Sequence, residues 1–148
     1  MANPVCELLL TKAELERAAE WPEVCVGAIV DFRGVVRATE LERIIRGIEY
    51  ETHAAMAEHQ LQLIGREAIE RFGLQMAVIR HRVGFVAVGE ASLFVRVAAP
   101  HRREAIHALE WLVDELKKRV PIWKHPEFEL NQEIQTVSAI PTPGILPT

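Results

Sequence analysis

Apolar residues recur every three to four positions in two long stretches of the chain, a spacing typical of amphipathic helices. The first stretch runs from about His53 to Phe72, and Gly73 suits its C-terminal end because glycine adopts the left-handed backbone common there. The second runs from about His101 to Arg119, and Pro121 prevents it from continuing. The pattern therefore predicts two main helices.

Short apolar runs rich in β-branched residues predict strands before and between these helices. The expected strands cover residues 5–10, 24–32, 43–51, 74–81, 84–88 and 92–98. We expect the second and third to pair through a turn at Arg33-Gly34, and the last three to form an antiparallel meander. Thr11-Lys12-Ala13-Glu14 offers a capping box for a short helix. These elements indicate an α+β fold with an antiparallel sheet and two main helices.

The chain of 148 residues fits a single domain. We expect that domain to span residues 1–124, and residues 125–148 to form a C-terminal extension. The last eight residues contain three prolines and one glycine, a composition that favours a mobile tail.

Composition narrows the class of protein. The chain is 49% hydrophobic and 26% charged, as globular proteins are, and no apolar run approaches the roughly 20 residues of a membrane helix. The net charge of −4 gives no reason to expect a nucleic acid or an anionic membrane as partner. Cys6 and Cys25 fit buried thiols better than a disulfide framework or a metal site. We therefore expect a cytoplasmic protein.

A basic cluster, His101-Arg102-Arg103, stands where the second helix is expected to begin. Cations are unfavourable at a helix N-terminus by about 0.3–1 kcal/mol each, because the helix dipole is positive there. A bound phosphate or carboxylate would offset this cost, since free amide hydrogens and guanidinium groups can converge on one anion. The alternative is an ordinary surface on which Glu104 and solvent screen the charges.

A second basic segment follows that helix. Lys117 and Lys118 lie in its last turn, where lysines are usually favourable surface residues. After the break at Pro121, the apolar pair Ile122-Trp123 can anchor the chain and fix the direction of Lys124. If Lys117 and Lys124 point into one pocket, their repulsion favours loss of a proton from one of them, which would make it a proton donor or nucleophile.

A third candidate is Arg37, at the end of a strand and glycine turn. It could be an anion ligand or a solvated hairpin arginine, and its spacing does not choose between the two. We interpret His81-Arg82-Val83-Gly84 as turn chemistry, with ligand contact by His81 or Arg82 as the alternative. The remaining histidines show no metal-ligand spacing, and no glycine-rich phosphate loop is present. The residues alone thus predict an α+β domain with a basic pocket for an anion.

Four blocks in order resemble the molybdopterin synthase catalytic subunit family. They are GAIVDFRGVVR (27–37), IEYETHAAMA (48–57), HRVGFVAVGEASLFVRVAAPHRREAI (81–106) and DELKKRVPIWK (114–124). The most specific feature is PHR followed by LK, and then PIWK with its lysine seven residues beyond the first. The resemblance covers the chain from about Cys25 to Lys124.

The resemblance implies an α/β-hammerhead fold and a homodimer, with a small ubiquitin-like sulfur carrier bound at each end to give a heterotetramer. The carrier's Gly-Gly tail, charged as a thiocarboxylate, would supply two sulfurs to cyclic pyranopterin monophosphate and yield molybdopterin. No metal and no cofactor is implied. Because this chain lacks a terminal Gly-Gly, we expect the sulfur donor to be another polypeptide.

The resemblance also implies roles for individual residues. Lys117 and Lys124 correspond to the family's essential lysines, and Arg37, His101 and Arg102 to its anion-binding residues, with Arg37 expected to act across the dimer interface. The chain departs from the family pattern after Arg37, where Ala38-Thr39-Glu40 replaces a more polar, asparagine-containing loop. Two alternatives stay open: a non-catalytic dimeric module that binds a carrier tail or phosphorylated ligand, and an enzyme of this fold with another acyl or sulfur transfer.

Overall fold

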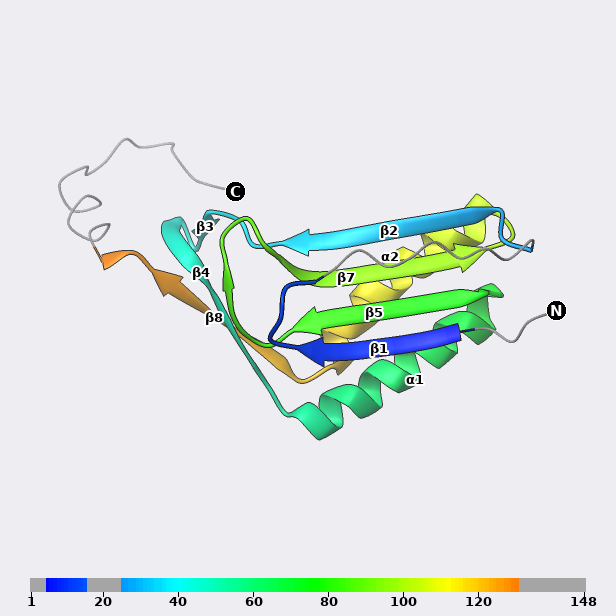
Figure 1. Ribbon diagram of the computed structural model, residues 1–148, viewed down its shortest axis with the longest axis horizontal. Coiled ribbons are helices and arrows are strands. Elements are labelled where there is room, and N and C mark those ends of the chain that lie inside the picture. The colour runs from blue at the N-terminus through cyan, green and yellow to red at the C-terminus, as the bar shows by residue number, and fades with distance from the viewer. Residues whose placement is uncertain (1–4, 16–24, 131–148) are drawn as a thin grey trace.

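The structure is a computed structural model that describes residues 5–15 and 25–130. This part of the chain forms two β-sheets and two helices (Figure 1). The elements are β1 (Val5–Thr11), β2 (Ala28–Val35), β3 (Thr39–Glu40), β4 (Arg43–Thr52), α1 (Ala54–Phe72), β5 (Met76–Arg82), β6 (Gly84–Ala87), β7 (Ala91–Ala99), α2 (Arg102–Arg119) and β8 (Ile122–Phe128).

The larger sheet has the strand order β1-β5-β7-β2. Its β1–β5 pair is parallel, whereas β5–β7 and β2–β7 are antiparallel. In the smaller sheet, β4 pairs with β3, β6 and β8, always antiparallel. The α+β class with mainly antiparallel sheets and two helices is therefore confirmed.

Two of the expected strand pairings are wrong. β2 and β4 lie in different sheets, and β2 continues through Arg33-Gly34 as a strand with an irregularity only after Gly34. The expected meander does not form either, because β6 pairs with β4 while β5 pairs directly with β7. Gly84, with φ of 84°, turns the chain out of β5 and toward the smaller sheet.

Both predicted helices are confirmed, within one residue at each end. α1 begins after His53, whose Nδ1 accepts a hydrogen bond from the Met56 backbone N–H at 3.3 Å. It ends at Gly73, which has left-handed backbone with φ of 63°. α2 begins after His101 and ends at Arg119, and the Val120 N–H still reaches the Leu116 carbonyl.

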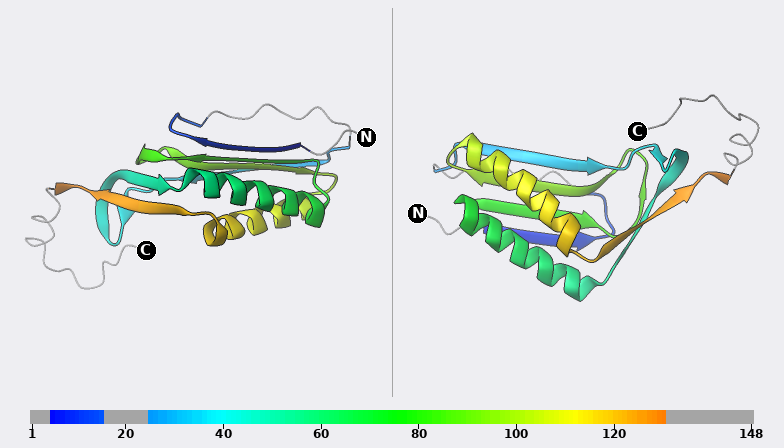
Figure 2. Two further views of the ribbon diagram at one scale, coloured as in Figure 1. Left: turned by 90° about the horizontal axis from the view of Figure 1, so that it is seen from below. Right: turned by 180° about the vertical axis from the view of Figure 1, so that it is seen from behind.

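Both helices cover one face of the larger sheet (Figure 2). The main core lies between this face and the helices. Inward-facing residues of β5 and β7 alternate with residues on the opposite face, as the two-residue period of a strand requires. That opposite face holds a smaller apolar cluster and a buried ion pair between Arg96 and Asp31. A third cluster lies in the smaller sheet and includes Ile48, Tyr50 and Val86.

β8 extends the sheet beyond the position where the sequence pattern weakens. It pairs with β4 as far as Phe128, so the first residues of the expected C-terminal extension belong to the smaller sheet. Residues 131–148, including the expected mobile tail, lie outside the described part, and the division at residue 124 stays a prediction.

The capping box at Thr11 does not start a helix within the residues described there. The Thr11 hydroxyl accepts from the Ala13 N–H at 3.0 Å, which makes a local side-chain turn instead of a helix cap. Residues 12–15 have no helical turn, and residues 16–24 lie outside the described part.

Candidate functional site

Lys117 and Lys124 lie on either side of the junction between α2 and β8. Both side chains are exposed, Lys117 in the last turn of α2 and Lys124 on β8 opposite Tyr50. Pro121 between them is held through its carbonyl, which accepts from the Thr52 hydroxyl at 3.0 Å and from the His53 N–H at 3.4 Å. The junction is thus tied to the start of α1, which fixes where β8 begins.

Arg37 joins this region through an acidic residue that the sequence analysis did not select. Glu40 places Oε1 at 3.2 Å from Lys124 Nζ and Oε2 at 3.8 Å from Arg37 Nη2. One carboxylate therefore lies between two of the predicted site cations. The available sequence signal was the position of Glu40, three residues after Arg37.

His101 and Arg102 lie at the opposite end of α2. His101 is the N-cap residue, but its side chain makes no capping hydrogen bond, and Arg102 is exposed in the first turn. The acidic residue of that turn, Glu104, is partly buried, and its Oε2 has no hydrogen-bond partner among the described residues. Free backbone N–H groups, the Arg102 guanidinium and the His101 imidazole thus meet at this helix end.

A single chain does not bring these two groups of residues together. His101 and Lys117 are sixteen positions apart on one continuous helix, which corresponds to about 24 Å along the helix axis. Figure 2 shows the two ends of α2 at opposite ends of the larger sheet, with β8 leaving from one of them. A site built from all five predicted residues therefore requires more than one copy of the chain.

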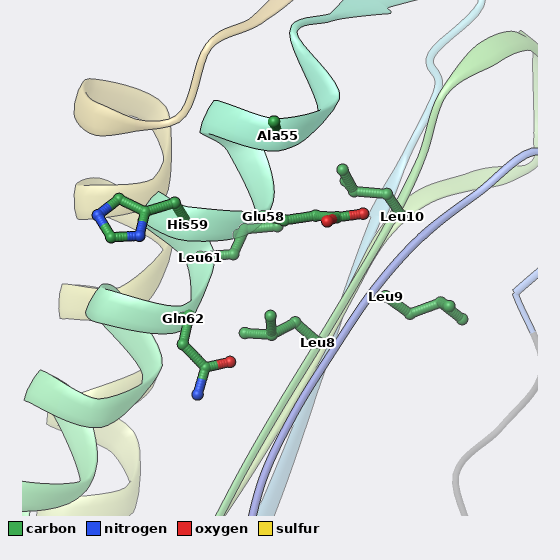
Figure 3. A pocket seen from close by; sticks show the side chains of 8 residues that line it. All are labelled: Leu8, Leu9, Leu10, Ala55, Glu58, His59, Leu61 and Gln62. Atoms are coloured by element: carbon green, nitrogen blue, oxygen red, sulfur yellow. The ribbon is translucent and has the colours of Figure 1, made fainter.

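A groove of about 530 Å³ lies elsewhere, between β1 and α1. Its wall from β1 is formed by residues 8–10, and Glu58 of α1 extends toward Leu10, whereas Leu9 points to the other side of the strand (Figure 3). None of the five predicted site residues lines it. The groove is therefore separate from the basic region.

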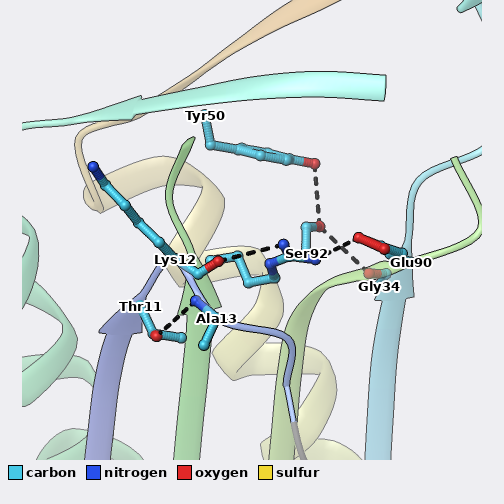
Figure 4. A network of polar contacts seen from close by, with 8 residues as sticks. Thr11, Lys12, Ala13, Gly34, Tyr50, Glu90 and Ser92 are labelled. Atoms are coloured by element: carbon cyan, nitrogen blue, oxygen red, sulfur yellow. Dashed lines mark hydrogen bonds and ion pairs between the residues drawn. The ribbon is translucent and has the colours of Figure 1, made fainter. Parts of the chain in front are cut away.

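His81 and Arg82, from the segment His81-Arg82-Val83-Gly84, belong to a set of buried polar contacts beside the smaller sheet. Arg82 is buried, and its Nη1 donates to Glu90 Oε1 at 2.8 Å; this hydrogen bond lowers the pKa of the Glu90 carboxyl. Tyr50 donates to the Ser92 hydroxyl at 3.1 Å, which connects the two sheets (Figure 4). Because Arg82 and His81 are buried, we assign both a structural role and do not count them among the exposed basic residues.

His81 is expected to make stability depend on pH. Its Nδ1–H donates to the Arg82 carbonyl at 2.6 Å, its ring meets Tyr50 edge-on, and burial lowers its pKa below the usual 6.5. Below about pH 6.5 the unfolded chain binds a proton that the folded protein resists, so stability falls as pH drops. Thermal unfolding followed between about pH 7.5 and 5.5 should show this loss.

The matched comparison for that loss is a pair of histidine variants. His81→Gln should flatten the decline in melting temperature, whereas His59→Gln, on the exposed face of α1, should leave the wild-type slope unchanged. Equal slopes in wild type and His81→Gln would show that His81 is not the titrating group.

Two further features limit the kinds of site present. Neither helix in residues 54–72 or 102–119 combines the length and apolar character needed to cross a membrane. Among the side chains that the structure places, no three from His, Cys, Asp and Glu cluster as metal ligands would.

Fold and surface together define an α+β protein of two sheets, with basic residues at both ends of α2 and a further pair of cations around Glu40. The family model described as MoaE protein matches residues 8–119. The chain therefore belongs to the MoaE protein family.

Relatives with described roles agree with this membership. The chain is 47% identical over 98 residues to a molybdopterin synthase catalytic subunit of Pyrococcus abyssi, covering 66% of each chain. It is 43% identical over 102 residues to the corresponding subunit of Emericella nidulans, covering 69% of this chain and 52% of that one. The chain thus spans about half to two thirds of the length of these relatives.

Solved structures agree on the fold. Molybdopterin synthase from Staphylococcus aureus superposes with a TM-score of 0.69 at 34% identity, covering 73% of this chain and 79% of that one. A complex of subunits 1 and 2 of the molybdopterin-converting factor from Helicobacter pylori matches with a TM-score of 0.61 at 23% identity, over 73% of this chain and 70% of that one. The second likeness concerns the fold alone.

Proposed function

We propose that this chain is a molybdopterin synthase catalytic subunit, which converts cyclic pyranopterin monophosphate to molybdopterin with two sulfurs from a thiocarboxylated small carrier. Family membership and the names of its relatives support the reaction. The observation that carries the proposal is the grouping of Arg37 and Lys124 around Glu40, with Lys117 in the last turn of α2, seven residues before Lys124. This arrangement suits two anions, a carrier C-terminus and a substrate phosphate.

Each lysine has a chemical task in this proposal. Lys117 orients the carrier's terminal thiocarboxylate and assists proton transfer as its sulfur attacks the substrate. Lys124 stabilises negative charge that develops on the substrate or intermediate. Each C–S bond that forms on the substrate replaces a C–O bond at the same carbon, and the displaced oxygen takes up a proton. The sulfur is then joined to the carrier as a thioester, which water hydrolyses, so that the sulfur stays on the substrate and the carrier is left with a carboxylate terminus.

We propose further that the site is completed by a second copy of the chain. His101 and Arg102 at the N-terminal end of α2 would bind the substrate phosphate, assisted by Arg37 of the other copy. The separation of about 24 Å along α2 supports this arrangement, because one chain cannot bring His101 beside Lys117. A homodimer of this kind would hold two equivalent sites and bind one carrier at each, as a heterotetramer.

The direct test mixes the purified chain with its thiocarboxylated carrier and cyclic pyranopterin monophosphate, and measures molybdopterin. Product formation is the expected result. Carrier binding without product would favour a non-catalytic binding module, and sulfur transfer to a different acceptor would favour another enzyme of the same fold. Either outcome would contradict the proposed reaction.

The shared site predicts complementation between two inactive variants. Lys117→Ala removes one half of a site and the double change His101→Ala with Arg102→Ala removes the other, so each protein alone should be inactive. After the two are unfolded together and refolded, half of the dimers are mixed, and each mixed dimer holds one intact site. We expect roughly a quarter of wild-type activity.

The control for complementation is each variant refolded alone at the same total concentration. Activity that appears only in the mixture supports a site made of two chains. A mixture as inactive as its components, with dimers present by light scattering, would contradict the shared site.

A further inference from the structure

Glu40 lies between two cations of the basic region and is less exposed than either of them. Its Oε1 is 3.2 Å from Lys124 Nζ and its Oε2 is 3.8 Å from Arg37 Nη2. The Glu40 side chain is 21% exposed, against 52% for Lys124 and 71% for Arg37. The carboxylate is thus the enclosed member of the group, while both cations reach solvent.

The smaller sheet fixes the position of this carboxylate. Glu40 ends β3 and pairs with Arg43 across a tight turn, in which Leu41 and Glu42 have left-handed backbone with φ of 50° and 64°. β8, which carries Lys124, pairs with the same β4. Glu40 and Lys124 thus lie on different strands that pair with β4, opposite Arg43 and Tyr50. Their side chains meet although these two positions are seven residues apart along β4, whose register with β8 shifts between Ile45 and Gly47.

We propose that Glu40 is an internal counter-ion that occupies the position of an incoming oxyanion, so that a ligand must displace it to reach Arg37 and Lys124. This inference deepens the proposed function, on which it rests, by identifying what tunes the affinity of the site. A phosphate or a carboxylate offers the same kind of oxygen ligands that Glu40 supplies. Binding is then an exchange of anions, and Glu40 offsets one of the two positive charges when the site is empty.

The exchange has a cost that can be measured. A ligand gains contacts with two cations but must break their pairs with Glu40 and leave that carboxylate close to its own charge. Exposed pairs each contribute modestly, so removing the Glu40 charge should tighten anion binding by about threefold to tenfold. Tighter binding would slow release of an anionic product, which gives the carboxylate a role in turnover.

The test compares Glu40→Gln with wild type by titrating each protein with inorganic phosphate and, separately, with an acetylated Gly-Gly peptide, monitored by NMR shifts. Glu40→Gln should bind at least one of them about threefold to tenfold tighter. A gain for phosphate assigns the position to a phosphate group, and a gain for the peptide assigns it to a C-terminal carboxylate. Adding Lys124→Ala to Glu40→Gln should abolish the gain.

Glu42→Gln is the matched control, because it removes the same charge from the same hairpin. Glu42 is exposed and forms no ion pair within residues 25–130, so its variant should bind anions as wild type does. Glu40→Asp should restore weaker binding. The proposal would be overturned if wild type and Glu40→Gln bound the two ligands with equal affinity, or if neither protein bound either ligand. An equal gain in affinity in Glu42→Gln would also overturn it.

These readouts separate the counter-ion role from the proposed reaction. The titrations need no turnover, so absence of molybdopterin formation would contradict the reaction and leave the affinity result to decide on Glu40. In the synthase assay, Glu40→Gln should lower KM by a similar factor without raising kcat, because it affects ground-state and transition-state binding alike. If Glu40 had a purely structural role, Glu40→Gln would change the stability of the protein and would not lower KM at unchanged kcat.

Discussion

Lys117→Ala should lower molybdopterin formation by about 100-fold or more, because a positioned proton donor typically contributes at least that factor. The carrier should still bind, since its globular body would contact more of the surface than one ammonium group. Single-turnover assays with the thiocarboxylated carrier measure the rate, and titration calorimetry measures carrier binding. Loss of both together would indicate that Lys117 serves docking and not chemistry.

The next residue supplies a matched control for Lys117. Lys118 is exposed, and its Nζ lies 3.6 Å from Glu115 Oε2, one turn back along α2. Lys118→Ala removes the same charge from the same helix turn and should change the rate by less than about twofold. If the two alanine variants lost activity equally, the effect would come from local charge and not from the direction of Lys117.

Lys117→Arg separates charge from proton transfer. Arginine keeps the positive charge but does not release a proton at neutral pH. A slow Lys117→Arg protein would support the role in proton transfer, whereas near-normal turnover would restrict Lys117 to orienting the thiocarboxylate.

Local sequence patterns were sufficient to predict the helices. α1 and α2 lie where the apolar period indicated, because Gly73 and Pro121 mark their ends by backbone properties that need no tertiary context. Strand pairing depends on contacts far apart in the chain, so β6 joined β4 and not the neighbouring β5. The turn assigned to Arg33-Gly34 failed for the same reason, since pairing with β7 keeps that segment extended.

β8 was missed because its sequence does not alternate cleanly. Lys124, His125 and Glu127 interrupt the apolar pattern, and Pro126 usually counts against a strand. Pairing with β4 compensates, and the face toward the apolar cluster is supplied by Ile122 and Phe128. β8 is therefore stabilised more by its pairing with β4 than by the strand propensity of its own residues.

The basic residues could be selected from the sequence, but their arrangement was harder to foresee. The spacing of His101 and Lys117 on one helix already implied that they lie far apart, and this was the available signal for a second copy. Glu40 was not selected because its partner Lys124 is 84 positions away, and a contact at that separation depends on the tertiary arrangement of β3, β4 and β8.

Asp31→Asn should destabilise the protein by about 3 kcal/mol, because it removes the negative charge that the buried Arg96 guanidinium contacts through two N–H groups. Arg96 donates to Asp31 through Nε at 2.6 Å and Nη2 at 2.7 Å, across directly opposed positions of β2 and β7. The Arg96 side chain is 2% exposed, so solvent cannot replace the lost charge. Urea unfolding followed by circular dichroism gives the change in free energy of unfolding.

The pair between Glu7 and Arg80 offers a matched control on the same sheet. Arg80 donates to Glu7 through the same two groups, at 3.0 and 2.7 Å, but Glu7 is 46% exposed and Arg80 17%. Glu7→Gln should therefore cost less than about 1 kcal/mol, because water screens this pair. Equal losses in the two variants would show that burial of Arg96 is not the cause.

Replacing both partners tests whether the penalty comes from the lost Asp31 charge. Arg96→Met together with Asp31→Leu removes both charges from β7 and β2, and should recover most of the stability lost in Asp31→Asn. The recovery is expected because the neighbouring residues on this face, Phe94 and Val78, are apolar and can pack against the new side chains. A double variant less stable than Asp31→Asn would instead assign the loss to packing around the Arg96 side chain, and not to its charge.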